Sequence, residues 1–226
     1  MPDFVVSLSE RLVESVTLAA LEAYVLGDGR PGRRHRPAVE TFGYVWGYGK
    51  GHGDHMVLYL DRMSLSLSSQ REPDAVTPNR HAAELKCNLM ERWSPHLSLI
   101  GDFHTHPYAS LAEVRETQGW KFSKADVEAL QNDDFLWDKA DGHPVALVVT
   151  VCRLGRVPAT FGTMPVGDAV ESFDVGEFRF WIGVNVGYLD EDGRRRQTFA
   201  DGDGVILDLG NRFSNAAGDR IAKHVR

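Results

Sequence analysis

Two histidines and a later carboxylate are the residues of this chain whose types and spacing suggest chemistry. His104 and His106 stand one residue apart at the end of the apolar run 97–103. If that run is a strand, both imidazoles lie on the same face, because strand side chains repeat every two residues. Asp126 follows Ser123 in a Ser-x-x-Asp pattern where a helical segment begins. Two imidazoles and one carboxylate, with a fourth position left to water, form the ligand set of a catalytic zinc site.

A hydrolytic zinc site also predicts a general base elsewhere in the chain. Zinc lowers the pKa of bound water to about 7, and a nearby carboxylate then takes the proton and passes it to the leaving group. Glu40 is the candidate, because it opens the predicted strand 39–48 in the pattern Glu-x-x-Gly-x-x-x-Gly. The two glycines of that pattern, Gly43 and Gly47, allow neighbouring backbones to approach closely.

The elements that must position these residues indicate one α/β domain with loop insertions. A helix over 7–26, begun by a Ser7-x-x-Glu10 capping box, precedes a hairpin and a second helix. The strand that carries the histidines is expected to stop at Pro107. The apolar run 145–151 suits a strand that is buried on both faces of a sheet. The other predicted elements are strands over 39–48 and 56–60, helices over 79–93 and 123–132, and C-terminal strands over 159–166, 178–189, 196–199 and 205–209.

A glutamate upstream, then His-x-His-Pro, then Ser-x-x-Asp resembles the motif of the JAMM metalloproteases, also called the JAB1/MPN family. The matching residues are Glu40, His104, His106, Pro107, Ser123 and Asp126. The order of elements over about residues 5–165 is similar to that of the family. The resemblance implies a mixed β-sheet flanked by helices in the JAB1/MPN, or cytidine-deaminase-like, architecture. It implies a single domain over 1–226, with 166–226 as a C-terminal strand extension.

The resemblance also assigns roles to the matching residues. His104, His106 and Asp126 would bind one Zn²⁺, and Glu40 would be the general base. The Ser123 hydroxyl would stabilise the developing oxyanion, a contribution that can reach about 2.7–4 kcal/mol. Family members cut peptide or isopeptide bonds after the C-terminal glycine of ubiquitin-like proteins, and bacterial-type relatives act on sulfur-carrier or ubiquitin-like tails. Such tails, with E1-like or E2-like conjugation proteins, are the partners that the resemblance suggests.

The chain departs from the family in one spacing. The family usually has seven residues between the second histidine and the serine, whereas the sixteen residues 107–122 lie between them here. An insertion that bulges out at the surface explains this difference. The alternative is a different carboxylate ligand: Glu113 follows Ser110 by three residues, but it lacks the helix-start setting of Asp126.

Composition narrows the classes of function. The chain has 226 residues, and its 42% apolar and 25% charged content is typical of a globular protein. With 25 basic against 32 acidic residues, its net charge of −7 argues against a nucleic-acid partner. No apolar run is long enough to cross a bilayer, and no signal peptide is predicted. Cys87 and Cys152 form no pair motif, so a reducing cytoplasm is the expected location.

The site residues and the peptidase function also have simpler alternative interpretations. Ser123-x-x-Asp126 is also a helix-capping pattern, and the cap would compete with a metal for the Asp126 carboxylate. A metal-free scaffold of the same fold, which only binds partners, is the alternative to a peptidase. A relative that acts near DNA is disfavoured by the acidic charge.

Other residues that could do chemistry have structural explanations as well. His52, Asp54 and His55 form a second metal-like cluster, but they fall in a predicted turn where solvated polar residues are normal. Cys87 on the helix 79–93 is expected to be a small buried apolar residue. That helix carries Ala82, Leu85, Leu89 and Trp93 on one face. Three aromatic residues either line a peptide groove or pack in the core: Trp120, Phe122 and Trp137.

Overall fold

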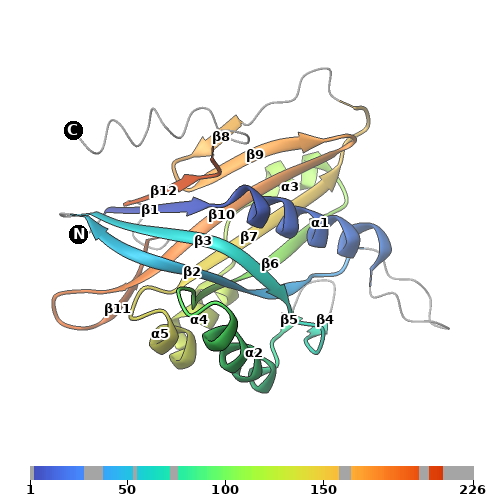
Figure 1. Ribbon diagram of the computed structural model, residues 1–226. Helices are drawn as coiled ribbons and strands as arrows, with labels where there is room; N and C mark the ends of the chain where they lie inside the picture. The colour runs from blue at the N-terminus through green and yellow to red at the C-terminus, as the bar shows by residue number, and fades with distance from the viewer. Residues whose placement is uncertain are drawn as a thin grey trace.

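A ten-stranded mixed sheet runs through the chain (Figure 1). The computed structural model describes residues 3–27, 38–52, 55–71, 76–157, 164–198 and 204–210. Its strands are β1 (Asp3–Leu8), β2 (Phe42–His52), β3 (His55–Leu65), β4 (Gln70–Arg71), β5 (Val76–Thr77), β6 (Ser98–Tyr108), β7 (Val145–Arg153), β8 (Met164–Gly167), β9 (Val170–Val175), β10 (Phe178–Leu189), β11 (Arg195–Gln197) and β12 (Val205–Asp208). The order in the sheet is β12-β1-β3-β2-β6-β7-β10-β9-β8; β11 pairs with β10, and β4 and β5 form a separate pair.

Helices cover both faces of this sheet (Figure 1). They are α1 (Glu10–Leu26), α2 (Arg80–Trp93), α3 (Leu111–Thr117), α4 (Lys124–Asn132) and α5 (Asp134–Lys139). Helix α1 packs on one face through a stripe that includes Leu12, Val16 and Ala20. On the other face, α2, α4 and α5 bury Ala83, Leu130 and Leu136. The predicted class, a mixed sheet flanked by helices, is therefore confirmed.

Strand β7 is buried on both faces, as its continuous apolar sequence predicted. Leu147 and Val149 contribute to the α1 side of the sheet, whereas Ala146 and Val148 contribute to the side of α2, α4 and α5. Strand β6 runs parallel beside it, with His104 level with Val148 and His106 level with Thr150. Because paired residues share a face, both imidazoles lie on the α4 side of the sheet.

Pro107 does not end β6, contrary to the expectation from sequence. The strand continues to Tyr108, and Pro107 pairs with Val151 of β7. The amide of Thr105 donates to the Thr41 carbonyl oxygen at 3.1 Å. Backbone nitrogens alternate in direction along a strand, so the Pro107 nitrogen, two residues later, points to the same edge of β6, the edge that faces β2. Pairing with β2 stops at His104, and a proline, which has no N–H to donate, is tolerated beyond that point.

The chain begins with a strand rather than with a helix over 7–26. Residues 3–8 form β1, which pairs in parallel with both β3 and β12. The N-cap of α1 is Ser9, whose hydroxyl oxygen accepts from the Leu12 amide at 3.1 Å, so the predicted Ser7-x-x-Glu10 cap is wrong. Gly27 ends the helix as expected, at φ 64°.

The two glycines after Glu40 do allow close backbone contact. A Cβ added at Gly43 would lie 2.8 Å from the Ser64 carbonyl oxygen, and one at Gly47 would overlap the Tyr59 carbonyl. Strand β2 starts only at Phe42, however, so Glu40 lies two residues before the strand that it was expected to open.

The far ends of the sheet approach each other because the sheet curls. The Leu207 amide of β12 donates to the Asp168 carbonyl oxygen in the β8–β9 turn at 2.8 Å. Strand β10, from the C-terminal segment, is an interior strand between β7 and β9. Of the predicted strand 159–166, residues 159–163 lie outside the described ranges, and residues 164–166 belong to β8. None of the described helices is both long and apolar enough to span a membrane.

Two helical features differ from the sequence expectation. Helix α2 buries Ala83 and Cys87, whereas its longer apolar stripe of Leu85, Leu89 and Trp93 faces solvent. The segment 107–122, which has no clear period in the sequence, contains α3. Ser110 caps α3, accepting from the Glu113 amide at 3.2 Å, while the Glu113 carboxylate accepts from the Ala109 amide at 3.1 Å.

Candidate metal centre

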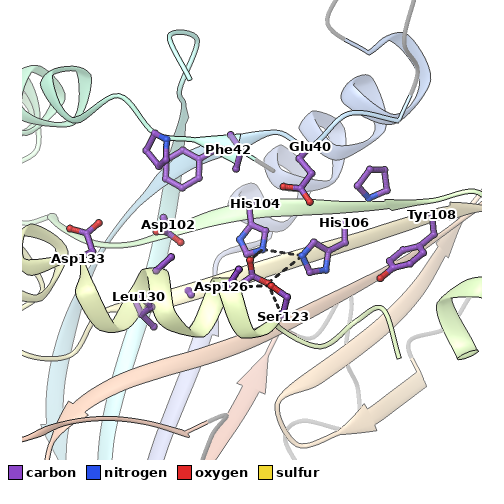
Figure 2. A pocket seen from close by; sticks show the side chains of 16 residues that line it. Glu40, Phe42, Asp102, His104, His106, Tyr108, Ser123, Asp126, Leu130 and Asp133 are labelled. Atoms are coloured by element: carbon purple, nitrogen blue, oxygen red, sulfur yellow. Dashed lines mark hydrogen bonds and ion pairs between the residues drawn. The ribbon is translucent and has the colours of Figure 1, made fainter. Parts of the chain in front are cut away.

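The two histidines of β6 face each other across a short gap. Their Nε2 atoms are 3.1 Å apart, and the ring centroids are 4.9 Å apart (Figure 2). Both side chains are largely buried, with 10% of the His104 side chain and 13% of the His106 side chain exposed. The alternation of strand side chains produces this arrangement, as predicted from their spacing.

Asp126 completes the group from the first turn of α4. Its Oδ1 lies 3.3 Å from the Nε2 of His104, and its Oδ2 lies 3.5 Å from the Nε2 of His106. Oδ2 also accepts the Ser123 amide at 2.6 Å, and the Ser123 hydroxyl oxygen accepts the Asp126 amide at 3.2 Å. The Asp126 carboxylate therefore forms the cap and still lies beside both imidazoles, so the cap does not turn it away from the histidines.

The spacing of the candidate ligand atoms fits a metal ion. Ligand atoms about 2.0–2.1 Å from a tetrahedral zinc lie about 3.3 Å from one another. The two Nε2 atoms are 3.1 Å apart, Oδ1 of Asp126 lies 3.3 Å from the Nε2 of His104, and Oδ2 lies 3.5 Å from the Nε2 of His106, so each pair of side chains has atoms near that separation. Among the described residues, His104, His106 and Asp126 are the group of histidine, cysteine and acidic side chains that could hold an ion.

Electrostatics keeps the Asp126 carboxylate ionised. Burial alone would raise the pKa of Asp126, but hydrogen bonds from His104 and His106 outweigh it and hold the pKa well below its ordinary value. Burial likewise lowers the pKa of His106, yet the Asp126 carboxylate and the Gly119 carbonyl together raise it overall. A proton therefore competes with a metal for His106, so metal affinity should weaken as the pH falls.

Glu40 lies above the imidazoles. Its side chain is buried, and Figure 2 shows the carboxylate pointing toward His104 and His106. Two hydrogen bonds fix the neighbouring residue to β6: the Thr41 amide donates to the Thr105 hydroxyl at 2.9 Å, and the Thr105 amide donates to the Thr41 carbonyl oxygen at 3.1 Å. The structure thus brings Glu40 to the group formed by the histidines and Asp126.

A cavity of about 470 Å³ runs past these residues, between β6 and α4. Tyr108 lies toward one end and Asp133 toward the other (Figure 2). Ser123, Ala125 and Ala129 line the α4 side, so small side chains leave room there. The Ser123 oxygen already accepts from the Asp126 amide, so its hydroxyl proton can point to a molecule in the cavity.

Asp102 also lines this cavity, although sequence reasoning did not select it. The signal that could have found it is the same alternation: Asp102 precedes His104 by two residues and shares its face of β6. Burial, together with the negative charges of Asp133 and Asp126, raises the pKa of Asp102 to about 8. A carboxyl group in this position is therefore mostly protonated at neutral pH.

Replacing Asp102 with asparagine should stabilise the metal-free protein, and more so at pH 8 than at pH 5. Between an unfolded pKa of about 3.9 and the folded value of about 8, the folded state retains a proton that the unfolded chain loses, so stability falls as the pH rises. Asparagine avoids this loss. We expect a gain of roughly 2 kcal/mol at pH 8, below the full linkage value because water enters the cavity. Denaturant unfolding measures it, with the exposed Asp192→Asn as control; equal gains at both pH values would contradict the assignment.

The remaining candidates lie apart from the metal group. The Glu113 carboxylate accepts the Ala109 amide at the start of α3, and Glu113 is not among the three residues of the metal group. Cys87 and Cys152 are free and buried, and burial raises the pKa of both thiols, that of Cys152 to about 11. Of the second metal-like cluster, Asp54 and the side chain of His52 lie outside the described residues.

The three aromatic residues pack rather than line the cavity beside the metal group. Trp137 is buried, and its indole N–H donates to the Leu130 carbonyl oxygen at 2.7 Å. Phe122 stands edge-on to the His104 ring, with centroids 6.2 Å apart. Trp120 stacks on Trp181, also at 6.2 Å. Core packing therefore describes Trp137, whereas Trp120 and Phe122 also line a second cavity of about 390 Å³.

Comparisons with protein-family models and with curated proteins found no match for this chain.

Proposed function

We propose that this protein is a zinc-dependent metallopeptidase of the JAMM, or JAB1/MPN, type. The observation that carries the proposal is the joint placement of His104, His106 and Asp126 at ligand spacing beneath the Glu40 carboxylate. Two imidazoles with one carboxylate are a ligand set of catalytic zinc sites, which keep a position open for water or substrate. All six residues of the motif line one cavity.

Zinc in this group would supply Lewis acidity, which polarises a scissile carbonyl and makes water acidic enough to attack at neutral pH. Glu40 would take the proton of the attacking water and return it to the leaving amine. The Ser123 hydroxyl, at the start of α4, would donate to the oxyanion as it develops. The buried position of Glu40 limits its access to bulk water, which suits a base that must return its proton.

The proposed substrate is the flexible glycine-ended tail of a ubiquitin-like or sulfur-carrier protein, cut at a peptide or isopeptide bond. Because Ala125 and Ala129 are small, the α4 side of the cavity has room for an extended main chain such as that of a glycine-ended tail. Main-chain pairing along a strand is a general way of holding such segments. E1-like or E2-like conjugation proteins are further proposed partners, and the acidic net charge makes nucleic acid an unfavourable one.

The test is cleavage of linear ubiquitin-like and sulfur-carrier fusions with a C-terminal reporter. We expect cleavage after the terminal glycine, loss of cleavage after treatment with a chelator, and recovery when zinc is added back. Metal analysis of the same preparation should give about one zinc per chain. Cleavage that survives complete metal removal would refute the proposal, whereas bound zinc without cleavage of either fusion would favour a binding module.

A further inference from the structure

The insertion 107–122 contacts the metal group directly, through a backbone carbonyl. The Gly119 carbonyl oxygen lies 3.2 Å from the Nδ1 of His106, and it also accepts the Thr150 hydroxyl at 2.8 Å. Thr150 is fully buried on β7, level with His106 in the parallel pairing of β6 and β7. A carbonyl oxygen has two lone pairs, so it can serve both donors together.

This contact selects one tautomer of the His106 imidazole. A carbonyl oxygen only accepts hydrogen bonds, so the Nδ1 of His106 must carry a proton. In the neutral ring, the lone pair then resides on Nε2, the atom that faces His104 and Asp126. Outer hydrogen bonds of this kind fix ring orientation and tautomer in metal sites, and losing one typically weakens metal binding 10–100-fold.

The insertion is anchored so that Gly119 keeps its place. Val114 of α3 is fully buried against Cys152 and Trp181, and Trp120 stacks on Trp181 with the rings 22° apart. The Tyr108 ring lies against Gly119 so closely that a Cβ there would overlap it. The carbonyl is thus held from three sides: by α3, by Trp120 and by the Thr150 hydroxyl.

We propose that Thr150 and the Gly119 carbonyl are positioning groups for the metal ligand His106, and that the long insertion serves as a part of the metal centre. The inference rests on the zinc site of the proposed function, but it does not depend on which substrate is cut. Thr150 acts only through Gly119, so the effect of its removal should appear first in metal affinity.

Thr150→Val removes the hydroxyl while retaining the shape of the side chain, and Thr150→Ser retains the hydroxyl. We expect Thr150→Val to bind zinc at least about tenfold more weakly than the parent in a chelator competition, and Thr150→Ser to recover most of that affinity. Thr17→Val is the matched control: Thr17 is buried in α1, and its hydroxyl has no hydrogen-bond partner among the described residues. That variant should bind zinc as the parent does.

Imidazole nitrogen resonances of the parent protein provide a second readout that requires no variant. Long-range proton–nitrogen spectra of the zinc-loaded protein should show His106 protonated at Nδ1 and coordinated through Nε2. In Thr150→Val that signal should broaden or shift. Coordination of His106 through Nδ1 in the parent would overturn the inference even if Thr150→Val failed to fold. Unchanged zinc affinity and an unchanged His106 signal in a folded Thr150→Val would overturn it while leaving the proposed peptidase intact.

Discussion

Glu40→Gln should abolish hydrolysis and leave zinc in place. Glutamine retains the size of the buried side chain, but its amide cannot take the proton of an attacking water. A general base of this kind typically raises the rate about 10²–10⁴-fold, so we expect kcat to fall by a factor in that range or larger. The three ligand side chains are untouched, and zinc affinity should therefore remain near that of the parent. Turnover of a fusion substrate and metal analysis on one preparation separate the two quantities.

Glu128→Gln is the matched control for this variant. Glu128 lies on the same helix as Asp126, and 62% of its side chain is exposed where it pairs with Lys124 at 3.5 Å. The control makes the same chemical change without altering the cavity and should hydrolyse the substrate as the parent does. A Glu40→Gln enzyme that turns over at the parent rate would show that another group is the base.

Asp126→Asn should lose zinc, and it should lower the free energy of unfolding through the lost charge rather than through the cap of α4. The asparagine oxygen can still accept the Ser123 amide, so most of the cap of α4 survives. The charge that holds the group together is lost, however, and so is one of three ligands. We expect zinc affinity to fall by more than the 10–100-fold that is typical of losing an outer partner. Chelator competition and denaturant unfolding of the same samples measure the two effects.

Ser123→Ala serves as the comparison, because it should lower stability without releasing zinc. It removes the hydroxyl that accepts the Asp126 amide, so it should lower the free energy of unfolding by about 1 kcal/mol. All three ligand side chains remain, and zinc should stay bound. If Asp126→Asn kept zinc as tightly as Ser123→Ala does, Asp126 would not be a ligand.

The local periodicities in the sequence were enough to predict most of the site. The two-residue repeat of strand side chains placed His104 and His106 on one face, and the helix-start pattern placed Asp126 in the first turn of α4. The same repeat includes Asp102, which lies within β6 two residues before His104 and shares its face. Glu40 was selected from the need for a general base and from its place before the glycines of the predicted strand 39–48, and the family resemblance then assigned it the same role.

Features that depend on packing partners distant in sequence were not predicted. Strand β1 has the six residues of an ordinary strand, but its two neighbours, β3 and β12, come from distant parts of the chain. The apolar stripe of α2 pointed to a buried face, yet the sheet receives the smaller side chains of Ala83 and Cys87 instead. Pro107 continues a strand because pairing with β2 has already ended there. None of these outcomes is visible in a local window.

The pairing of β1 with β12 has a consequence for how the chain reaches its native state. Phe4 lies level with Val205, so the first strand acquires one of its two neighbours only after some two hundred further residues have been synthesised. Contacts between segments so far apart close large loops and form slowly. On the ribosome, an emerging chain would therefore wait with a hydrogen-bonding edge of β1 unsatisfied, a state in which assistance from a chaperone would be valuable.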